Sequence, residues 1–171
     1  MPGSGKGVFR RVVQRMGYPV VIMGDVVREE VKQRNLEPTP ENLGKTMLNL
    51  RALEGPAAVA KLCIPKLKKA TEKMVVIDGI RSLAEVEEFK KHFPNLVLVA
   101  IHSVPETRYK RLFRRRRSDD PTNWETFMER DLRELGIGMG AVIAAADHTI
   151  MNEGTSAQLK TEIRQVIKEL L

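Results

Sequence analysis

The residues with the clearest capacity for chemistry stand at the start of the chain, which reads MPGSGKG over residues 1–7. Glycines at this spacing let backbone N–H groups turn inward around phosphate oxygens, and the lysine adds a movable positive charge. A helix that follows such a loop directs its positive end at the same anion. The pattern therefore predicts a phosphate-binding loop made by Gly3, Ser4, Gly5 and Gly7, with Lys6 as its cation.

This loop departs from the full phosphate-binding motif at two points. The motif GxxxxGK[ST] opens with a glycine that would precede Met1, and a buried strand should lead into it. It also has Ser or Thr after the lysine, as a ligand for Mg²⁺, where this chain has Gly7. A short Gly/Ser-rich start is also typical of a flexible leader or a tag remnant. The rest of the chain must therefore decide between these two interpretations.

Short apolar runs predict the buried strands that position these residues, because the runs are rich in β-branched residues and too short for helices. They are residues 19–23, 74–78, 96–102 and 148–152. Apolar residues at helical spacing predict helices over 6–16, 26–35, 41–53, 56–69, 83–92, 105–117, 123–135 and 141–146, and a last helix that ends at 170. Asp25 and Ser82 are expected to cap two of these helices, with Glu85 completing a capping box. Thr155 or Ser156 is expected to cap the last one. Short apolar strands alternating with helices predict an α/β fold, a parallel sheet with helices on both faces.

Composition and charge fit a globular protein that binds an anion. Apolar residues make up 42% of the chain and charged residues 30%, and no apolar run approaches the roughly 20 residues of a membrane span. A lone cysteine, Cys63, excludes an internal disulfide and suits a cytoplasmic location. The net charge is +7, and six arginines stand between Arg108 and Arg117. An aromatic content of 5% disfavours a stacking platform for single-stranded nucleic acid, so nucleic acid is not the favoured partner.

Polar and charged residues follow each predicted strand. The first strand is followed by GDVVR, the second by GIR, the third by Ser103 and the arginine-rich helix, and the last ends in NEGT. Ligands of parallel sheets bind beyond the carboxyl ends of the strands, so these residues should gather at one edge. Cations that spread charge on a transferred group, together with carboxylates that hold Mg²⁺ and its waters, are what phosphoryl transfer requires.

At these positions the chain resembles the nucleoside monophosphate kinases, adenylate kinase above all, which move a phosphoryl group from ATP to a nucleotide. Their loop reads PGSGKG, as it does here, and they hold Mg²⁺ largely through water. Their next residue is usually threonine, and here it is Val8, which removes a phosphate-contacting hydroxyl. The resemblance implies a P-loop NTPase fold with a three-layer αβα arrangement, and ATP held by residues 3–8.

Two further motifs resemble the acceptor site of that family. The motif GDxxR implies that Arg28 binds the acceptor monophosphate. The motif DGxR resembles the family's DGFPR without its proline, and implies Arg81 as a second acceptor arginine. Asp25 and Asp78 would then order the waters around Mg²⁺. Glu85 lies where adenylate kinases have a glutamine that reads the acceptor base, so the acceptor need not be AMP.

The arginine-rich stretch, residues 106–117, resembles the family helix that leads into the lid. The resemblance suggests Arg111 and Arg115 as donor-phosphate contacts. The segment RSDD, which begins at Arg117, resembles the R-x-D-D motif beyond the lid, with Arg130 as a later partner. The long lid that separates these two stretches in the family is missing here.

The end of the chain looks more like a dephospho-CoA kinase, through the segment ADHTIMNEGT at residues 146–155. This likeness implies that Asn152 and Gly154 lie in a loop that touches the donor adenine. Taken together, the resemblance covers nearly the whole chain and fits best an archaeal family related to nucleotide kinases.

The sequence therefore predicts one P-loop domain over residues 1–171, with a helical acceptor-binding insert at about 36–70 and a short lid at about 114–135. Mg-ATP would donate its γ-phosphoryl group to a phosphorylated small molecule, such as a nucleoside monophosphate. The expected catalytic residues are Lys6, Arg81, Arg111, Arg115 and Arg117. Two alternatives remain open: a regulatory ATP-binding protein without turnover, and a basic nucleic-acid-binding module.

The buried strand that should lead into the phosphate loop is missing from this sequence, which leads to a further expectation. In the resembling fold, the strand before the loop lies at the centre of the sheet. Without it, the neighbouring strands would lose ladder hydrogen bonds and leave buried backbone groups unpaired. We therefore expect the native start to lie about eight residues upstream of Met1.

Overall fold

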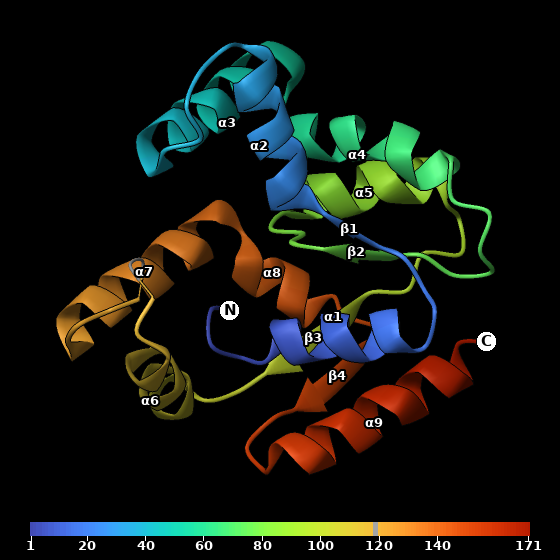
Figure 1. The fold of residues 1–171 in the computed structure, drawn as a ribbon, viewed down its shortest axis with the longest axis vertical. Coiled ribbons are helices and arrows are strands. Elements are labelled where there is room, and N and C mark those ends of the chain that lie inside the picture. Colours follow the sequence, from blue (N-terminus) through green and yellow to red (C-terminus); the bar gives the residue numbers. More distant parts are fainter. Residues whose placement is uncertain (118–119) are drawn as a thin grey trace. The chain divides into compact units, whose positions relative to one another are not determined.

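The computed structural model describes residues 1–117 and 120–171, and the chain divides into two compact units. The terminal unit contains residues 1–17 and 97–171, and the middle unit contains residues 18–96. Each unit combines a short parallel sheet with helices, as the α/β prediction requires (Figure 1). The single domain, its insert and its lid stay predictions. In the part of the chain that the structure describes, no helix combines the length and the apolarity needed to cross a bilayer.

The terminal unit holds strands β3 (Val99–His102) and β4 (His148–Met151), which form a two-stranded parallel sheet. Its helices are α1 (Lys6–Arg15), α6 (Pro105–Arg115), α7 (Trp124–Ile137), α8 (Met139–Ala144) and α9 (Ser156–Glu169). The Asp147 carboxylate accepts the N–H of Leu98 at 2.7 Å, just before the first ladder pair. This bond fixes where the pairing of β3 with β4 begins.

Helices α1 and α9 lie side by side in the terminal unit (Figure 1). Helix α1 buries Val12 and Val13, and α9 buries Leu159, Ile163 and Ile167 at a spacing of four residues. Thr155 is the cap of α9: its Oγ1 accepts the N–H of Gln158, and the Gln158 side chain accepts the N–H of Thr155. This reciprocal capping box starts the helix directly after the β4 loop.

The middle unit holds strands β1 (Val20–Ile22) and β2 (Val76–Asp78), which are also paired in parallel. Its helices are α2 (Met23–Gln33), α3 (Pro40–Glu54), α4 (Ala58–Lys68) and α5 (Leu83–His92). The register places Ile22 opposite Asp78, so the two strands end at the same edge of their sheet. The polar residues that follow each strand therefore start from a common edge.

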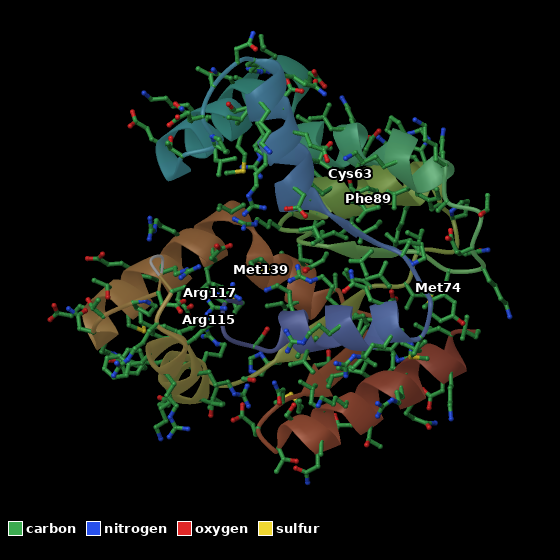
Figure 2. The ribbon with its side chains drawn as sticks, in the orientation of Figure 1. Cys63, Met74, Phe89, Arg115, Arg117 and Met139 are labelled. Carbon is green, nitrogen blue, oxygen red and sulfur yellow. The ribbon has the colours of Figure 1, made fainter. Side chains whose placement is uncertain are left out.

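The core of the middle unit is one cluster of buried side chains from α2, α4 and α5. Its members are Met23, Val26, Val27, Val59, Ala60, Cys63, Ile64, Leu67 and Phe89. Figure 2 labels Cys63 and Phe89, where α4 lies against α5. Burial raises the pKa of the Cys63 thiol to about 12, so Cys63 is a packed side chain and not a reactive one.

Two local predictions in the middle unit are wrong. Strand β1 ends at Ile22 because Met23 to Asp25 already belong to α2, so Asp25 lies in the first turn of this helix and does not cap it. Ser82 does cap α5, since its Oγ accepts the N–H of Glu85 at 3.3 Å. Glu85, however, does not complete a capping box, because its carboxylate accepts the N–H of Arg81 instead.

Candidate functional site

The predicted phosphate loop, residues 3–7, begins within the tight turns of residues 2–5, and its last two residues, Lys6 and Gly7, open α1. Gly3 and Gly5 adopt φ values of +80° and +116°, which residues other than glycine rarely adopt. A Cβ atom at Gly3 would lie 2.8 Å from the backbone oxygen of Arg108, and one at Gly5 would lie 2.5 Å from Asn152 Nδ2. The two glycines are therefore required both by the turn and by the close approach of neighbouring chain.

Several polar groups of the loop have no partner in the described residues. The N–H groups of Gly5 and Gly7 have no acceptor there, and no side chain caps the N-terminus of α1. The first turn of α1 contains no acidic residue. Ser4 is only 1% exposed, and among the described residues its Oγ has no hydrogen-bond partner. Unpaired donors at a helix N-terminus fit an anion, and this geometry suits phosphate oxygens.

Lys6, the predicted cation of this loop, lies over the loop itself. Its Nζ donates to the carbonyl oxygen of Met1 at 3.2 Å. A neutral carbonyl is a weaker partner for an ammonium group than a phosphate oxygen is. The lysine side chain has rotatable bonds enough to exchange the one for the other. Val8 follows in the first turn of α1 and is half-buried.

Asn152, predicted to lie in a loop that touches the donor adenine, is hydrogen-bonded to the phosphate loop. It is 6% exposed, and its Nδ2 donates to the carbonyl oxygen of Ser4 at 2.8 Å. Arg111 donates to its carbonyl oxygen at 2.9 Å and to its Oδ1 at 3.3 Å. The structure thus brings together Ser4, Arg111 and Asn152, all three of them predicted site residues. Gly154 is exposed two residues further on.

Arg108 and Asp131 form a buried ion pair that the sequence analysis did not assign to the site. The Arg108 guanidinium is bonded to both carboxylate oxygens of Asp131, and it also donates to the carbonyl oxygens of Ser103 at 3.0 Å and Pro2 at 3.3 Å. Its central carbon lies 5.1 Å from the centre of the Phe127 ring. Arg108 thus joins α6, α7 and the start of the loop. The only signal in the sequence was its helical spacing from Leu112, the next buried residue of α6.

Arg115 and Arg117 lie at the end of α6, near α7 (Figure 2). Arg115 Nε donates to Asp120 Oδ2 at 2.9 Å, and the backbone N–H of Arg117 donates to the same oxygen at 2.9 Å. Arg130, expected as a later partner, has its Nη1 3.9 Å from Asp120 Oδ1. The hydrogen bond from Arg115 is the main cause that lowers the pKa of Asp120. Ser118 and Asp119 of the RSDD segment lie outside the described residues.

The predicted acceptor residues lie in the middle unit. Arg28 Nη1 donates to Asp25 Oδ1 at 2.5 Å in the first turns of α2, on an exposed surface. Asp78 is half-buried at the end of β2. Glu85 is 1% exposed, and its Oε2 accepts the N–H of Arg81 at 2.8 Å. The Glu85 carboxylate therefore fixes the backbone from which the Arg81 side chain extends.

Arg51 of α3 is a further residue that the sequence analysis missed. Its guanidinium lies 3.6 Å from Glu85 Oε1, so the buried carboxylate has a cation on one oxygen and the Arg81 N–H on the other. Burying a carboxylate is costly unless it has such partners. Arg51 is separated from Glu85 by a whole helix, and no motif at that position indicated the contact.

A tightly coordinated metal is not indicated in the part of the chain that the structure describes. There, no group of three or more His, Cys, Asp or Glu side chains could hold a metal ion. Asp78 is the last residue of β2 and Asp25 lies in the first turn of α2, which follows the neighbouring strand β1; carboxylates in such positions suit Mg²⁺ held through its waters.

Glu153 is bonded to the first turn of α6. Its Oε1 accepts the N–H of Val104 at 2.7 Å, and its Oε2 accepts the hydroxyl of Thr107 at 2.6 Å. The Thr107 hydrogen bond is the main cause that lowers the pKa of Glu153. The β4 loop is thereby attached to α6 at a second point, besides the contact of Arg111 with Asn152.

Comparison of the sequence with known proteins shows a family match and several similar relatives. The sequence model of a family described as AAA domain matches residues 1–128. The UPF0200 protein of Pyrococcus furiosus is 51% identical over 171 residues, covering 98% of this chain and 92% of its own. The UPF0200 protein of Methanocaldococcus jannaschii is 46% identical, with coverages of 100% and 87%.

The crystal structure of TT1252 from Thermus thermophilus is similar with a TM-score of 0.67 and 19% identity, covering 99% of this chain and 94% of that one. At this identity the likeness shows the fold alone. Together with the AAA-domain match, it confirms the predicted P-loop α/β fold of the three-layer αβα type. The archaeal relatives confirm the predicted kinship with an archaeal family.

Proposed function

We propose that this chain transfers the γ-phosphoryl group of ATP to a phosphorylated small molecule. The premise of the proposal is that the chain belongs to the UPF0200 family and has its nucleotide-binding P-loop fold. The observation that carries the proposal is the loop at residues 3–7. Its two glycines turn where side chains are excluded, and the N–H groups of Gly5 and Gly7 have no acceptor in the described residues. A loop of this kind at a helix N-terminus is built to bind phosphate.

In the proposed reaction, an oxygen of the acceptor phosphate attacks the γ-phosphorus, the bond to the β–γ bridging oxygen breaks, and ADP leaves. The chain needs no nucleophilic side chain for this step, because the contribution of such an enzyme is positioning and charge neutralisation. Mg²⁺, when bound, would neutralise charge on the β- and γ-phosphate oxygens.

The loop backbone and Lys6 are assigned to the donor phosphates. Lys6 would exchange its hydrogen bond to the Met1 carbonyl for one to a phosphate oxygen. Arg115 and Arg117 are assigned to the transferred group, in a lid that closes over the site. Arg115 would have to leave the Asp120 carboxylate to reach it.

Arg28 and Arg81 are assigned to the acceptor phosphate, and Asp25 and Asp78 to the waters of Mg²⁺. The buried contact of Glu85 with the Arg81 N–H supports a role in holding this arginine. Because both oxygens of that carboxylate already have partners, Glu85 is a poor candidate to read the acceptor base as a glutamine does. AMP, other nucleoside monophosphates and dephospho-CoA are the acceptors to compare.

A regulatory ATP-binding protein without turnover is the second candidate function. Two observations favour it: Val8 stands where the family's threonine would offer a hydroxyl, and Lys6 is bonded to its own loop. A nucleic-acid-binding module is the third, supported by the exposed side chains of Arg114 and Arg116 at the end of α6.

The test is ADP release from Mg-ATP against a panel of nucleoside monophosphates and dephospho-CoA. Stimulation by one acceptor that is lost in Arg81→Ala, but kept in Arg34→Ala, is the expected result. Arg34 is a matched control because it lies in the same unit and pairs only with Glu30 of its own helix α2 among the described contacts. ATP binding without acceptor-dependent turnover would favour the regulatory protein. Salt-sensitive binding of RNA or DNA that ignores Arg28 and Arg81 would favour the nucleic-acid module.

A further inference from the structure

The peptide unit between Ser4 and Gly5 is held from one side by Asn152. Asn152 Nδ2 donates to the carbonyl oxygen of Ser4 at 2.8 Å, and both residues are buried. In a trans peptide the C=O and the following N–H point in opposite directions. An amide that fixes the Ser4 carbonyl therefore also fixes the direction of the Gly5 N–H. That N–H has no acceptor in the described residues, so it is available to a phosphate oxygen.

The orientation of the Asn152 amide is in turn set by Arg111. Arg111 Nη2 donates to Asn152 Oδ1 at 3.3 Å, so this oxygen faces the arginine and the NH₂ group faces Ser4. Were the amide flipped, its NH₂ would face the guanidinium, and two carbonyl-type oxygens would face each other at the loop. The arginine thus selects the one amide orientation that can bind the loop.

Arg111 is itself held in place by the β4 loop and by Ser103. It donates to Ser103 Oγ at 2.9 Å and to the Asn152 carbonyl at 2.9 Å, while Ser103 Oγ donates to the same carbonyl at 2.6 Å. Ser103 is fully buried and Arg111 is half-buried. The two terminal nitrogens of the Arg111 guanidinium therefore donate to three acceptors within the protein.

The loop and the amide also pack too closely to move independently. A Cβ atom at Gly5 would lie 2.5 Å from Asn152 Nδ2 and 3.1 Å from Leu159 Cδ2. Any rotation of the Asn152 side chain would therefore displace the loop backbone beside it.

We infer that Arg111 acts on the phosphate loop through Asn152, by holding the amide that aims the Gly5 N–H, and not as a direct ligand of the donor phosphates. The functional consequence of this inference rests on the proposed function, in which the Gly5 N–H binds the phosphates of the donor. Arg111 and Asn152 are then positioning residues, and the position of α6 is coupled to the conformation of the loop.

The test is a double-mutant cycle with Arg111→Ala, Asn152→Ala and the double variant, read by the dissociation constant of ADP. Each single change should weaken ADP binding about tenfold, the size of one lost hydrogen bond to a positioned group. The double variant should bind no more weakly than the weaker single variant, because both changes remove the same contact. Effects that multiply, to about a hundredfold, would show that Arg111 contacts the phosphates by itself and would overturn the inference.

A second readout does not need a nucleotide. Amide hydrogen exchange of residues 4–9 in the ligand-free protein should accelerate equally in both single variants and no further in the double variant. Exchange that is unchanged in Arg111→Ala would contradict the inference even if the wild-type protein bound no nucleotide, a result that would by itself count against the proposed function. Arg114→Ala, an exposed arginine of the same helix, is the matched control and should leave both readouts unchanged.

The variant Asn152→Asp distinguishes between the two hydrogen bonds of the Asn152 amide, one with Arg111 and one with the Ser4 carbonyl. The carboxylate keeps and strengthens the contact with Arg111 but has no N–H for the Ser4 carbonyl. ADP binding weakened as much as in Asn152→Ala is expected. Wild-type binding by Asn152→Asp would show that the bond to Ser4 does not matter, and would overturn the inference.

Discussion

Replacing Gly5 by alanine is expected to destabilise the loop and to abolish nucleotide binding. Gly5 has a φ of +116°, and a Cβ atom there would lie 2.5 Å from Asn152 Nδ2. The backbone conformation alone costs an alanine about 1–2 kcal/mol. The clash must also displace the buried Asn152 amide from the Ser4 carbonyl, which adds about 1–3 kcal/mol for a lost buried hydrogen bond. The free energy of unfolding should therefore fall by about 2–5 kcal/mol.

Gly17→Ala is the matched control for this experiment. Gly17 has a φ of +89°, but no atom of the described part of the chain lies within 4 Å of a Cβ atom built there. It should lose only the backbone contribution, about 1–2 kcal/mol, and keep nucleotide binding. Urea unfolding of both variants, with a titration of ADP, measures the two contributions separately. A loss of stability in Gly5→Ala no larger than that in Gly17→Ala, with ADP binding intact, would refute the argument from the close contact.

Three further outcomes are expected. Because the pKa of Cys63 is raised to about 12, its thiol should react with a thiol reagent at neutral pH orders of magnitude more slowly in the folded protein than in urea, and an equal rate would contradict its burial. Phe89→Ala should lower the free energy of unfolding by about 3–5 kcal/mol, because it empties a fully buried position, while Leu48→Ala, at a side chain 67% exposed, should change it by less than about 0.5 kcal/mol. Asp120 has a pKa lowered mainly by Arg115, so its ionised form stabilises the folded state above the carboxyl's ordinary pKa of 3.8, and this contribution is lost as the pH falls through the lowered pKa. The difference in stability between the wild type and Asp120→Asn should therefore be constant at neutral pH and shrink on acidification, and a difference that grew would show the sign to be wrong.

Local patterns allowed much of the fold to be predicted. Helix α5 begins and ends at the predicted residues, because Ser82 caps it and apolar spacing marks its buried face. Strand β1 ends one residue earlier than predicted, because the first turn of α2 takes up Met23. A short apolar run does not show where a strand gives way to a helix, since the same side chains are buried in both.

The contacts of the site residues could not be predicted in the same way. Asn152 and Ser4 are 148 positions apart, and no local pattern states that the amide of one binds the carbonyl of the other. No motif singled out Arg108 or Arg51, yet one is buried against Asp131 and the other lies beside the buried Glu85. Motifs identified the residue types of the site, whereas the bonds that orient them depend on which distant segments the fold brings together.

The most direct test of the central claim is the rate of acceptor-dependent ADP release from Mg-ATP by the wild-type protein and by Lys6→Ala. We expect one phosphorylated acceptor to stimulate release in the wild type, and Lys6→Ala to lower that rate at least about a hundredfold because the donor phosphates lose their cation. Equal rates in both proteins, or a wild type that releases no ADP with any acceptor, would contradict it.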